Sequence, residues 1–193
     1  MQSNASMRAF VVDLLKRNIP SFYYYHNYQH TLYVADKAIE IGKEEGCTER
    51  EIMLVNAAAL WHDAGYITTY AGHETESARL AAEYLPAYGY SAEEIGKIHG
   101  MIMATSVPQS PKNKLEEIVA DADLEYLGTG EAAHQADLFF RELNHLNPSL
   151  TKEQWDRKQI SFLQSHHYFT EYCKKHKESA KSDYLKSLLA KIE

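Results

Sequence analysis

The spacing of apolar residues along this chain is helical almost throughout. Between about residues 28 and 45, Val34, Ala38 and Ile41 follow one another at three- and four-residue intervals, which places them on one face of a helix. The same spacing predicts further helices over residues 7–17, 48–65, 73–88, 91–105, 114–127, 131–146, 151–165 and 168–191. No segment reads as a β-hairpin. The pattern therefore predicts an all-α protein.

Capping residues indicate where several of these helices begin. A serine or threonine is followed three positions later by Glu or Gln, the capping-box pattern of a helix start, at Thr48–Glu51, Ser91–Glu94 and Thr151–Gln154. The segment 105–113 is the clearest loop, yet no linker, repeat or low-complexity tract divides the chain. We therefore expect one domain over residues 1–193, with a core at about 20–130 and C-terminal helices at about 131–193 packed on it.

The composition limits the classes of function. A chain of 193 residues with a formal net charge of −7 lacks the clustered Lys and Arg that bind a phosphate backbone, so we expect no nucleic-acid polymer as partner. A small phosphorylated ligand stays compatible with this charge, because a bound cation reverses the local sign. Two distant cysteines, the absence of a signal-peptide pattern and the lack of a long apolar run favour a cytoplasmic protein without membrane contact. The composition is compatible with a homo-oligomer.

Four polar residues occupy positions where these helices should be apolar. His30 shares the apolar face of its helix, and His62 and Asp63 end an alanine-rich apolar run. Asp123 also lies on the apolar side of its helix, whereas Asp121 lies about 200° around the axis and is expected to face solvent or to support the site from behind. A single inward histidine is more often a hydrogen-bonded core residue. Four such residues on three helices instead favour a common site.

A divalent metal ion is the simplest partner for these four residues. An ionised carboxylate in an apolar setting costs several kcal/mol unless it is paired or bound to a metal. No Lys or Arg occupies a matching inward position. Mixed imidazole and carboxylate ligands suit Mn, Fe, Co, Ni, Zn or Mg, and the spacing does not select among these ions.

The order of these residues resembles the signature of a known family. His30, the adjacent pair His62 and Asp63, and Asp123 are similar to the H…HD…D signature of the HD superfamily of metal-dependent phosphohydrolases. Further segments resemble one branch of phosphohydrolases in that superfamily, namely YHNYQH (25–30), LWHDAGY (60–66), HETESA (73–78), DADLEYLG (121–128) and WDRKQISFL (155–163). The resemblance implies a single HD-type helical bundle whose central helices hold the metal through these four ligands.

The resemblance also implies an activity. Metal-activated water would hydrolyse a phosphoester or phosphoanhydride of a nucleotide or of another small phosphorylated molecule. Asp63 would both ligate the ion and orient the water, and His73 and Glu74 are the nearest candidates for catalytic acid or base. Glu74 has an ordinary alternative, because the helix dipole by itself favours an acidic residue in a first turn.

Three residues are candidates for substrate contact. His26 precedes the first ligand by one helical turn, Thr105 ends its helix where the resemblance also places a threonine, and Arg157 lies in the last matching segment. Arg79 and Arg141 are further candidates for a phosphate clamp. For each arginine, a solvated surface position is the ordinary alternative. The tyrosines of residues 22–28 would either stack on a base or pack at the edge of the core.

Two questions stay open at the level of sequence. His73 would suit a second metal ion, but Ala104 and Thr105, where the resemblance places a further histidine, carry none, and His99 on the inward face is out of phase with them. A mononuclear site is therefore the simpler expectation. The alternatives to a hydrolase are a nucleotide-binding or metal-stabilised HD module without turnover and, less favoured because it needs more histidines, an HD-fold iron oxygenase.

Overall fold

The regular structure of this protein is entirely helical over residues 4–191, the range that the computed structural model describes. The α-helices are α1 (Asn4–Asn18), α2 (Tyr28–Glu44), α3 (Glu49–Trp61), α4 (His73–Tyr84), α5 (Ala92–Met103), α6 (Lys114–Asp123), α7 (Ala132–Leu146), α8 (Lys152–Ser165), α9 (Glu171–His176) and α10 (Glu178–Leu189). Single-turn 3-10 helices are η1 (Ala64–Ile67), η2 (Leu85–Tyr88) and η3 (Glu125–Gly128). The predicted all-α class is confirmed. The predicted range 1–193 also includes residues 1–3 and 192–193, which lie outside the described residues.

The helix starts follow the capping residues of the sequence. The Thr48 hydroxyl accepts a hydrogen bond from the backbone N–H of Glu51, whose carboxylate accepts one from the N–H of Thr48. The same reciprocal pair of bonds opens α5 at Ser91 and α8 at Thr151. Each box satisfies two backbone donors that a helix start would otherwise leave without partners.

Four predicted helices are interrupted where the chain turns. The one predicted over 73–88 is an α-helix only to Tyr84 and continues as η2. The helix predicted over 48–65 ends at Trp61, and η1 then packs so closely on α4 that a Cβ on Gly65 would lie 2.0 Å from the His73 carbonyl oxygen. The helix predicted over 114–127 ends at Asp123 and continues as η3. The helix predicted over 168–191 is divided at Lys177, which lies against Gly128 of η3. Periodicity does not mark these breaks, because the apolar spacing continues across them.

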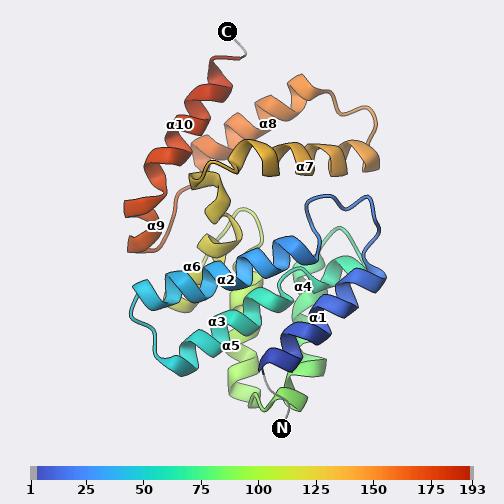
Figure 1. Cartoon of the computed structure of the whole chain (residues 1–193), viewed down its shortest axis with the longest axis vertical. Helices are drawn as coiled ribbons and strands as arrows, with labels where there is room; N and C mark the ends of the chain where they lie inside the picture. The colour runs from blue at the N-terminus through green and yellow to red at the C-terminus, as the bar shows by residue number, and fades with distance from the viewer. Residues whose placement is uncertain (1–3, 192–193) are drawn as a thin grey trace.

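The helices form two packed groups (Figure 1). In the larger group α2 packs against α3 and α6, and α5 packs against α3, α4 and α6. In the smaller group α7, α8 and α10 lie beside one another, and α10 also packs on η3. Residues of α8, α10 and η3, with Tyr25 from the loop before α2, make a second apolar cluster there. No helix within residues 4–191 combines the length and apolar character that crossing a bilayer requires.

Buried polar groups join the C-terminal segment to the larger group. Asp121 is fully buried and accepts hydrogen bonds from the backbone N–H groups of Phe169 and Thr170 and from the Thr170 hydroxyl. The expectation that Asp121 faces solvent is therefore wrong, because the chain before α9 covers that side of α6. His99 departs in the opposite sense, since it is exposed rather than inward. Helical phase alone does not show which faces a later segment covers.

Candidate metal centre

Four side chains from α2, the end of α3 and the end of α6 converge at one point. His30 Nε2 lies 3.0 Å from Asp123 Oδ1 and 3.6 Å from Asp63 Oδ2. His62 Nε2 lies 3.3 Å from Asp63 Oδ2 and 3.5 Å from Asp123 Oδ1. Ligand atoms of His30, His62 and Asp123 all lie within 4.8 Å of one another. The fold thus brings the four predicted ligands together, with Asp63 Oδ2 beside both imidazoles.

The orientation of His62 suits metal ligation. Its Nδ1–H donates to the carbonyl oxygen of Ala59 at 2.7 Å, so Nε2 is the ring nitrogen that faces the other three residues. His62 Nε2 and Asp63 Oδ2 are both buried without a hydrogen-bond partner. Ligand atoms about 2.1 Å from one ion lie about 3.0–3.4 Å apart in octahedral or tetrahedral geometry, close to the separations found here. The residues therefore fit a divalent cation.

The electrostatics of the cluster favour ionised carboxylates. Burial lowers the pKa of His62, but the charges of Asp63 and Asp123 more than offset this effect and hold that pKa well above its usual range. Burial raises the pKa of Asp63, yet His62 and His73 hold it well below its usual range. The pKa of Asp123 is lowered in the same way by His30 and His62. An incoming cation would therefore replace histidine protons between carboxylates that are already charged.

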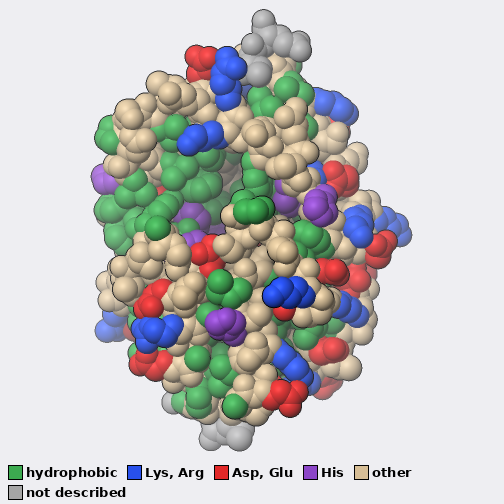
Figure 2. Space-filling view, turned by 180° about the vertical axis from the view of Figure 1, so that it is seen from behind, with side chains coloured by type: hydrophobic (Ala, Val, Ile, Leu, Met, Phe, Trp, Pro, Cys, Tyr) green, Lys and Arg blue, Asp and Glu red, His purple; other side chains and the backbone are tan. Residues whose placement is uncertain are grey.

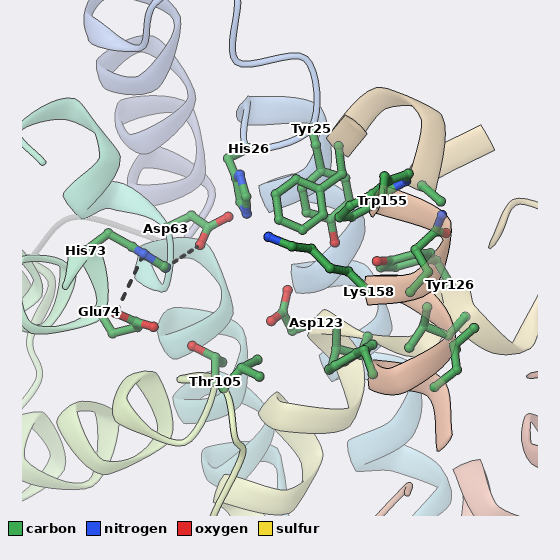
Figure 3. A pocket seen from close by; sticks show the side chains of 18 of the residues that line it. Tyr25, His26, Asp63, His73, Glu74, Thr105, Asp123, Tyr126, Trp155 and Lys158 are labelled. Atoms are coloured by element: carbon green, nitrogen blue, oxygen red, sulfur yellow. Dashed lines mark ion pairs between the residues drawn. The ribbon is translucent and has the colours of Figure 1, made fainter. Parts of the chain in front are cut away.

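The tight packing of η1 on α4 places His73 beside the cluster. Only a residue without a side chain fits at Gly65, whose N–H donates to the Ser77 hydroxyl at 2.7 Å. The His73 ring stacks on Tyr66 with ring centroids 3.9 Å apart, and its Nε2 lies 3.4 Å from Asp63 Oδ1. Glu74 Oε2 lies 3.6 Å from His73 Nδ1 (Figure 3). His73 thus contacts the Asp63 oxygen that does not face His30 and His62.

A cavity of about 400 Å³ opens directly onto this cluster. Its lining residues come from both packed groups: Tyr25, His26, Asp63, Tyr66, His73, Glu74, Thr105, Val107, Asp123, Leu124, Tyr126, Leu127, Ala136, Phe139, Trp155, Lys158, Gln159, Phe162, Leu163 and Tyr184. Figure 2 shows a hollow in which hydrophobic side chains surround histidine and acidic side chains. The residues predicted from the sequence gather on one side of the cavity, and aromatic and aliphatic residues form the other.

The structure does not bring Arg157 to this cavity. Arg157 is exposed, and its guanidinium pairs with Glu153 one turn earlier at 3.0 Å. Arg79 pairs with Glu76 and Glu83 on α4, and Arg141 lies over the ring of Tyr24. None of the three arginines lines the cavity.

The neighbouring residue Lys158 is the cation that does line it. Lys158 extends from α8 across the cavity toward the side that carries Asp63 and His26 (Figure 3). It makes no ion pair with an acidic side chain of the described residues. The matching C-terminal segment therefore supplies a cation to the cavity one position later than the sequence suggested.

Glu142 of α7 is the site residue that sequence reasoning missed. It is fully buried, pairs with His26 Nδ1 through Oε1, and accepts hydrogen bonds from the N–H groups of Tyr25 and His26 through Oε2. It also accepts a hydrogen bond from the Tyr70 hydroxyl at 3.2 Å. A signal was present, because Glu142 follows Phe139 by three positions on the inward face of α7. It is an inward carboxylate of the same kind as Asp123.

Two histidines and two carboxylates face one another at α2, the end of α3 and the end of α6. This arrangement in a helical bundle is typical of HD domains, and comparisons with known proteins give the same family. The family model described as HD domain matches residues 27–125, more than half of the chain. This protein therefore belongs to the HD domain family. A crystal structure described as a predicted HD superfamily hydrolase from an uncultured Thermotogales bacterium superposes with a TM-score of 0.61 at 20% identity. The superposition covers 96% of this chain and 92% of that one. A search of curated proteins finds no match.

Proposed function

We propose that this protein is a metal-dependent phosphohydrolase that acts on a phosphoester or phosphoanhydride of a small molecule. The observation that carries the proposal is the cluster of His30, His62, Asp63 and Asp123, whose facing donor atoms are buried, partly unpartnered and open to a cavity. The cavity also holds a cation for phosphate and a histidine–carboxylate pair for proton transfer. Membership of the HD domain family and the fold of the Thermotogales hydrolase support the same general class.

In this proposal the four clustered residues hold one divalent ion. Such an ion, when bound, lowers the pKa of water and neutralises charge on phosphoryl oxygens. The carbonyl of Ala59 aims Nε2 of His62 at the other three residues, so the ring needs no reorientation when an ion replaces its proton. Asp63 presents one oxygen to the imidazoles and the other to His73, which makes it the residue best placed to orient the attacking water.

The phosphate contact comes from Lys158 in this proposal, and Thr105 offers an acceptor to another group of the ligand. Lys158 reaches toward the carboxylate side of the cavity without an acidic partner, so its ammonium is free to pair with a phosphate oxygen. The Thr105 hydroxyl donates to the Ile102 carbonyl at 2.8 Å and keeps its lone pairs for a ligand donor. Arg157 has no part in binding, because it lies on the surface.

His26 is the proton donor to the leaving group in this proposal. Glu142 holds Nδ1 of His26, so the opposite ring nitrogen is directed away from that carboxylate and into the cavity that His26 lines. Burial raises the pKa of Glu142, but the adjacent His26 more than offsets it and keeps the carboxyl ionised. A general acid must present its proton to the leaving group, and the ring nitrogen opposite Nδ1 is the one that faces the cavity. His73 and Glu74 remain the acid–base pair on the side of Asp63.

Phosphate release from a panel of small phosphoesters and nucleotides, with Mn, Co, Ni, Zn, Fe or Mg supplied, tests the proposal. The control is the His62→Ala, Asp63→Ala double variant, checked for helical content. Release by the wild type and not by this variant supports hydrolysis. Ligand-induced stabilisation without release would instead support a module without turnover, and oxygen uptake with iron would support an oxygenase.

A further inference from the structure

The side of the cavity away from the metal centre is a rigid aromatic wall. The rings of Tyr25 and Phe139 stack with centroids 5.0 Å apart, and Trp155 meets Phe139 edge-on at 5.3 Å. Tyr25 also packs edge-on against Tyr126 at 5.7 Å. Phe162 completes this side of the cavity. The rings come from four segments of the chain and hold one another in place, so the wall is formed before any ligand binds.

Polar groups are few on this wall, and those of Tyr184 and Gln159 already have partners. The Tyr184 hydroxyl donates to Gln159 Oε1 at 2.8 Å, and Gln159 Nε2 donates to Asp156 at 3.1 Å. The hydroxyls of Tyr25 and Tyr126 lie near each other. The indole nitrogen of Trp155 has no partner, but it has almost no accessible surface and therefore does not face the cavity.

A ligand that reaches this wall would find little to satisfy its own polar groups. Beyond the hydroxyls of Tyr25 and Tyr126, the wall offers little to the hydroxyls of a sugar or the polar edge of a nucleobase. Most of these groups would lose water without gaining a hydrogen bond, which costs free energy for each group. A flat apolar ring would lose nothing of this kind and would gain stacking with Phe139 or Phe162. Lys158 is the charged side chain that α8 contributes to the cavity, and it points away from the wall, toward the side with Asp63 and His26 where the phosphate is proposed to bind.

We propose that the substrate is a phosphomonoester of an apolar aromatic alcohol, with its ring against the wall of Tyr25, Phe139, Trp155 and Phe162. This inference rests on the proposed hydrolase function and narrows it. In the reaction the bond between phosphorus and the alcohol oxygen breaks, and the oxygen of water bonds to phosphorus. The water gives up one proton and the departing alcohol oxygen gains one, so the products are the alcohol and inorganic phosphate.

A series of esters with similar leaving groups tests the choice of substrate class. Benzyl phosphate, ethyl phosphate, glycerol 3-phosphate and a nucleoside 5′-monophosphate all release a primary alcohol, so differences in kcat/KM report binding of the organic group rather than leaving-group chemistry. We expect kcat/KM for benzyl phosphate to exceed the other three at least about tenfold. A nucleotide or glycerol ester that equals or exceeds benzyl phosphate overturns this inference and leaves the proposed hydrolase in place.

A matched pair of variants tests the position of the ring. Phe162 lines the cavity, whereas Phe169 is half-buried outside it. Phe162→Ala should lower the ratio of kcat/KM for benzyl phosphate to that for ethyl phosphate about three- to tenfold, and Phe169→Ala should leave the ratio unchanged. An unchanged ratio in folded Phe162→Ala contradicts the placement. If that variant does not fold, the ester series on the wild type decides.

A binding measurement separates failure of this inference from failure of the proposed function. Benzylphosphonate and methylphosphonate resist hydrolysis, and Trp155 in the wall reports binding by its fluorescence. Even without turnover of any ester, which would overturn the hydrolase, binding of benzylphosphonate at least about tenfold tighter than methylphosphonate supports the apolar subsite. Equal affinities for the two phosphonates overturn it.

Discussion

The carboxylate of Glu142 on α7 binds both the ring and the backbone N–H of His26, a residue 116 positions earlier in the chain. Glu142 lies outside the matched HD region 27–125, and so do Phe139, Trp155 and Lys158. The C-terminal helices therefore complete the cavity that the metal centre opens onto. In the proposed mechanism they supply the partner of the proton donor and a contact for phosphate.

Replacing Glu142 by Gln tests the role of this pair. The amide keeps the shape but removes the negative charge that pairs with His26 Nδ1 and fixes the ring, so kcat should fall about 10- to 100-fold while metal affinity stays unchanged. Steady-state kinetics and calorimetric metal titration measure the two effects.

The matched control is Glu131→Gln, which changes an exposed glutamate just before the same helix. Wild-type kcat in folded Glu142→Gln would contradict a role for the pair in proton transfer.

Metal binding should stabilise the protein through the four clustered residues. An ion at about 100 times its dissociation constant adds about 2.7 kcal/mol to the free energy of unfolding, which a thermal melt detects. We expect Tm to rise with the preferred divalent ion, to fall again with a chelator, and to respond to neither in His62→Ala. The exposed histidine His99 offers a matched control, so His99→Ala should respond as the wild type does. A full metal response in His62→Ala would rule out His62 as a ligand.

The adjacent cations Lys158 and Arg157 should behave differently. Lys158 points into the cavity, whereas Arg157 pairs with Glu153 on the surface. Loss of a hydrogen bond to a charged group costs about 1.5–3 kcal/mol, so Lys158→Ala should raise KM for a phosphoester about tenfold or more. Arg157→Ala should change KM less than twofold. The opposite ranking in substrate kinetics would return the phosphate contact to Arg157.

His166 should make the stability of the protein sensitive to acid. Burial and then the nearby charge of Lys181 lower the pKa of His166 to about 3 in the folded protein. The unfolded chain, with a histidine pKa of about 6.5, therefore binds more protons between about pH 6.5 and pH 3, so the free energy of unfolding falls as pH is lowered through this window. Above pH 6.5 the neutral ring stabilises the fold fully.

Urea unfolding at a series of pH values between 7 and 4 measures this effect. His166→Gln should lose stability less steeply on acidification than the wild type, whereas replacement of the exposed neighbour, His167→Gln, should not change the slope. Equal slopes in the wild type and His166→Gln would show that His166 is protonated as readily in the fold as in the unfolded chain.

Local signals in the sequence were sufficient for the residues of the candidate metal centre. His30 and Asp123 break an apolar face with a group that is costly to bury, and such a break is visible in helical phase without knowledge of the neighbours. The same phase was misleading for Asp121 and His99, because burial of an outer face depends on which later segment covers it. Glu142 is an inward carboxylate like Asp123, but its contact with His26 joins two distant segments and could not be predicted from helical phase.

The sequence by itself determined the all-α class, the capped helix starts and the polar residues at apolar helix positions, because each depends on interactions within a few turns of one helix. Only the tertiary structure decided that Lys158 rather than Arg157 reaches the cavity and that Phe139 and Trp155 form the apolar wall of that cavity. It also decided that Glu142 holds His26. These relationships depend on how α7 and α8 pack over η3. That packing is set by the summed contacts of many side chains far apart in the chain, which no local pattern records.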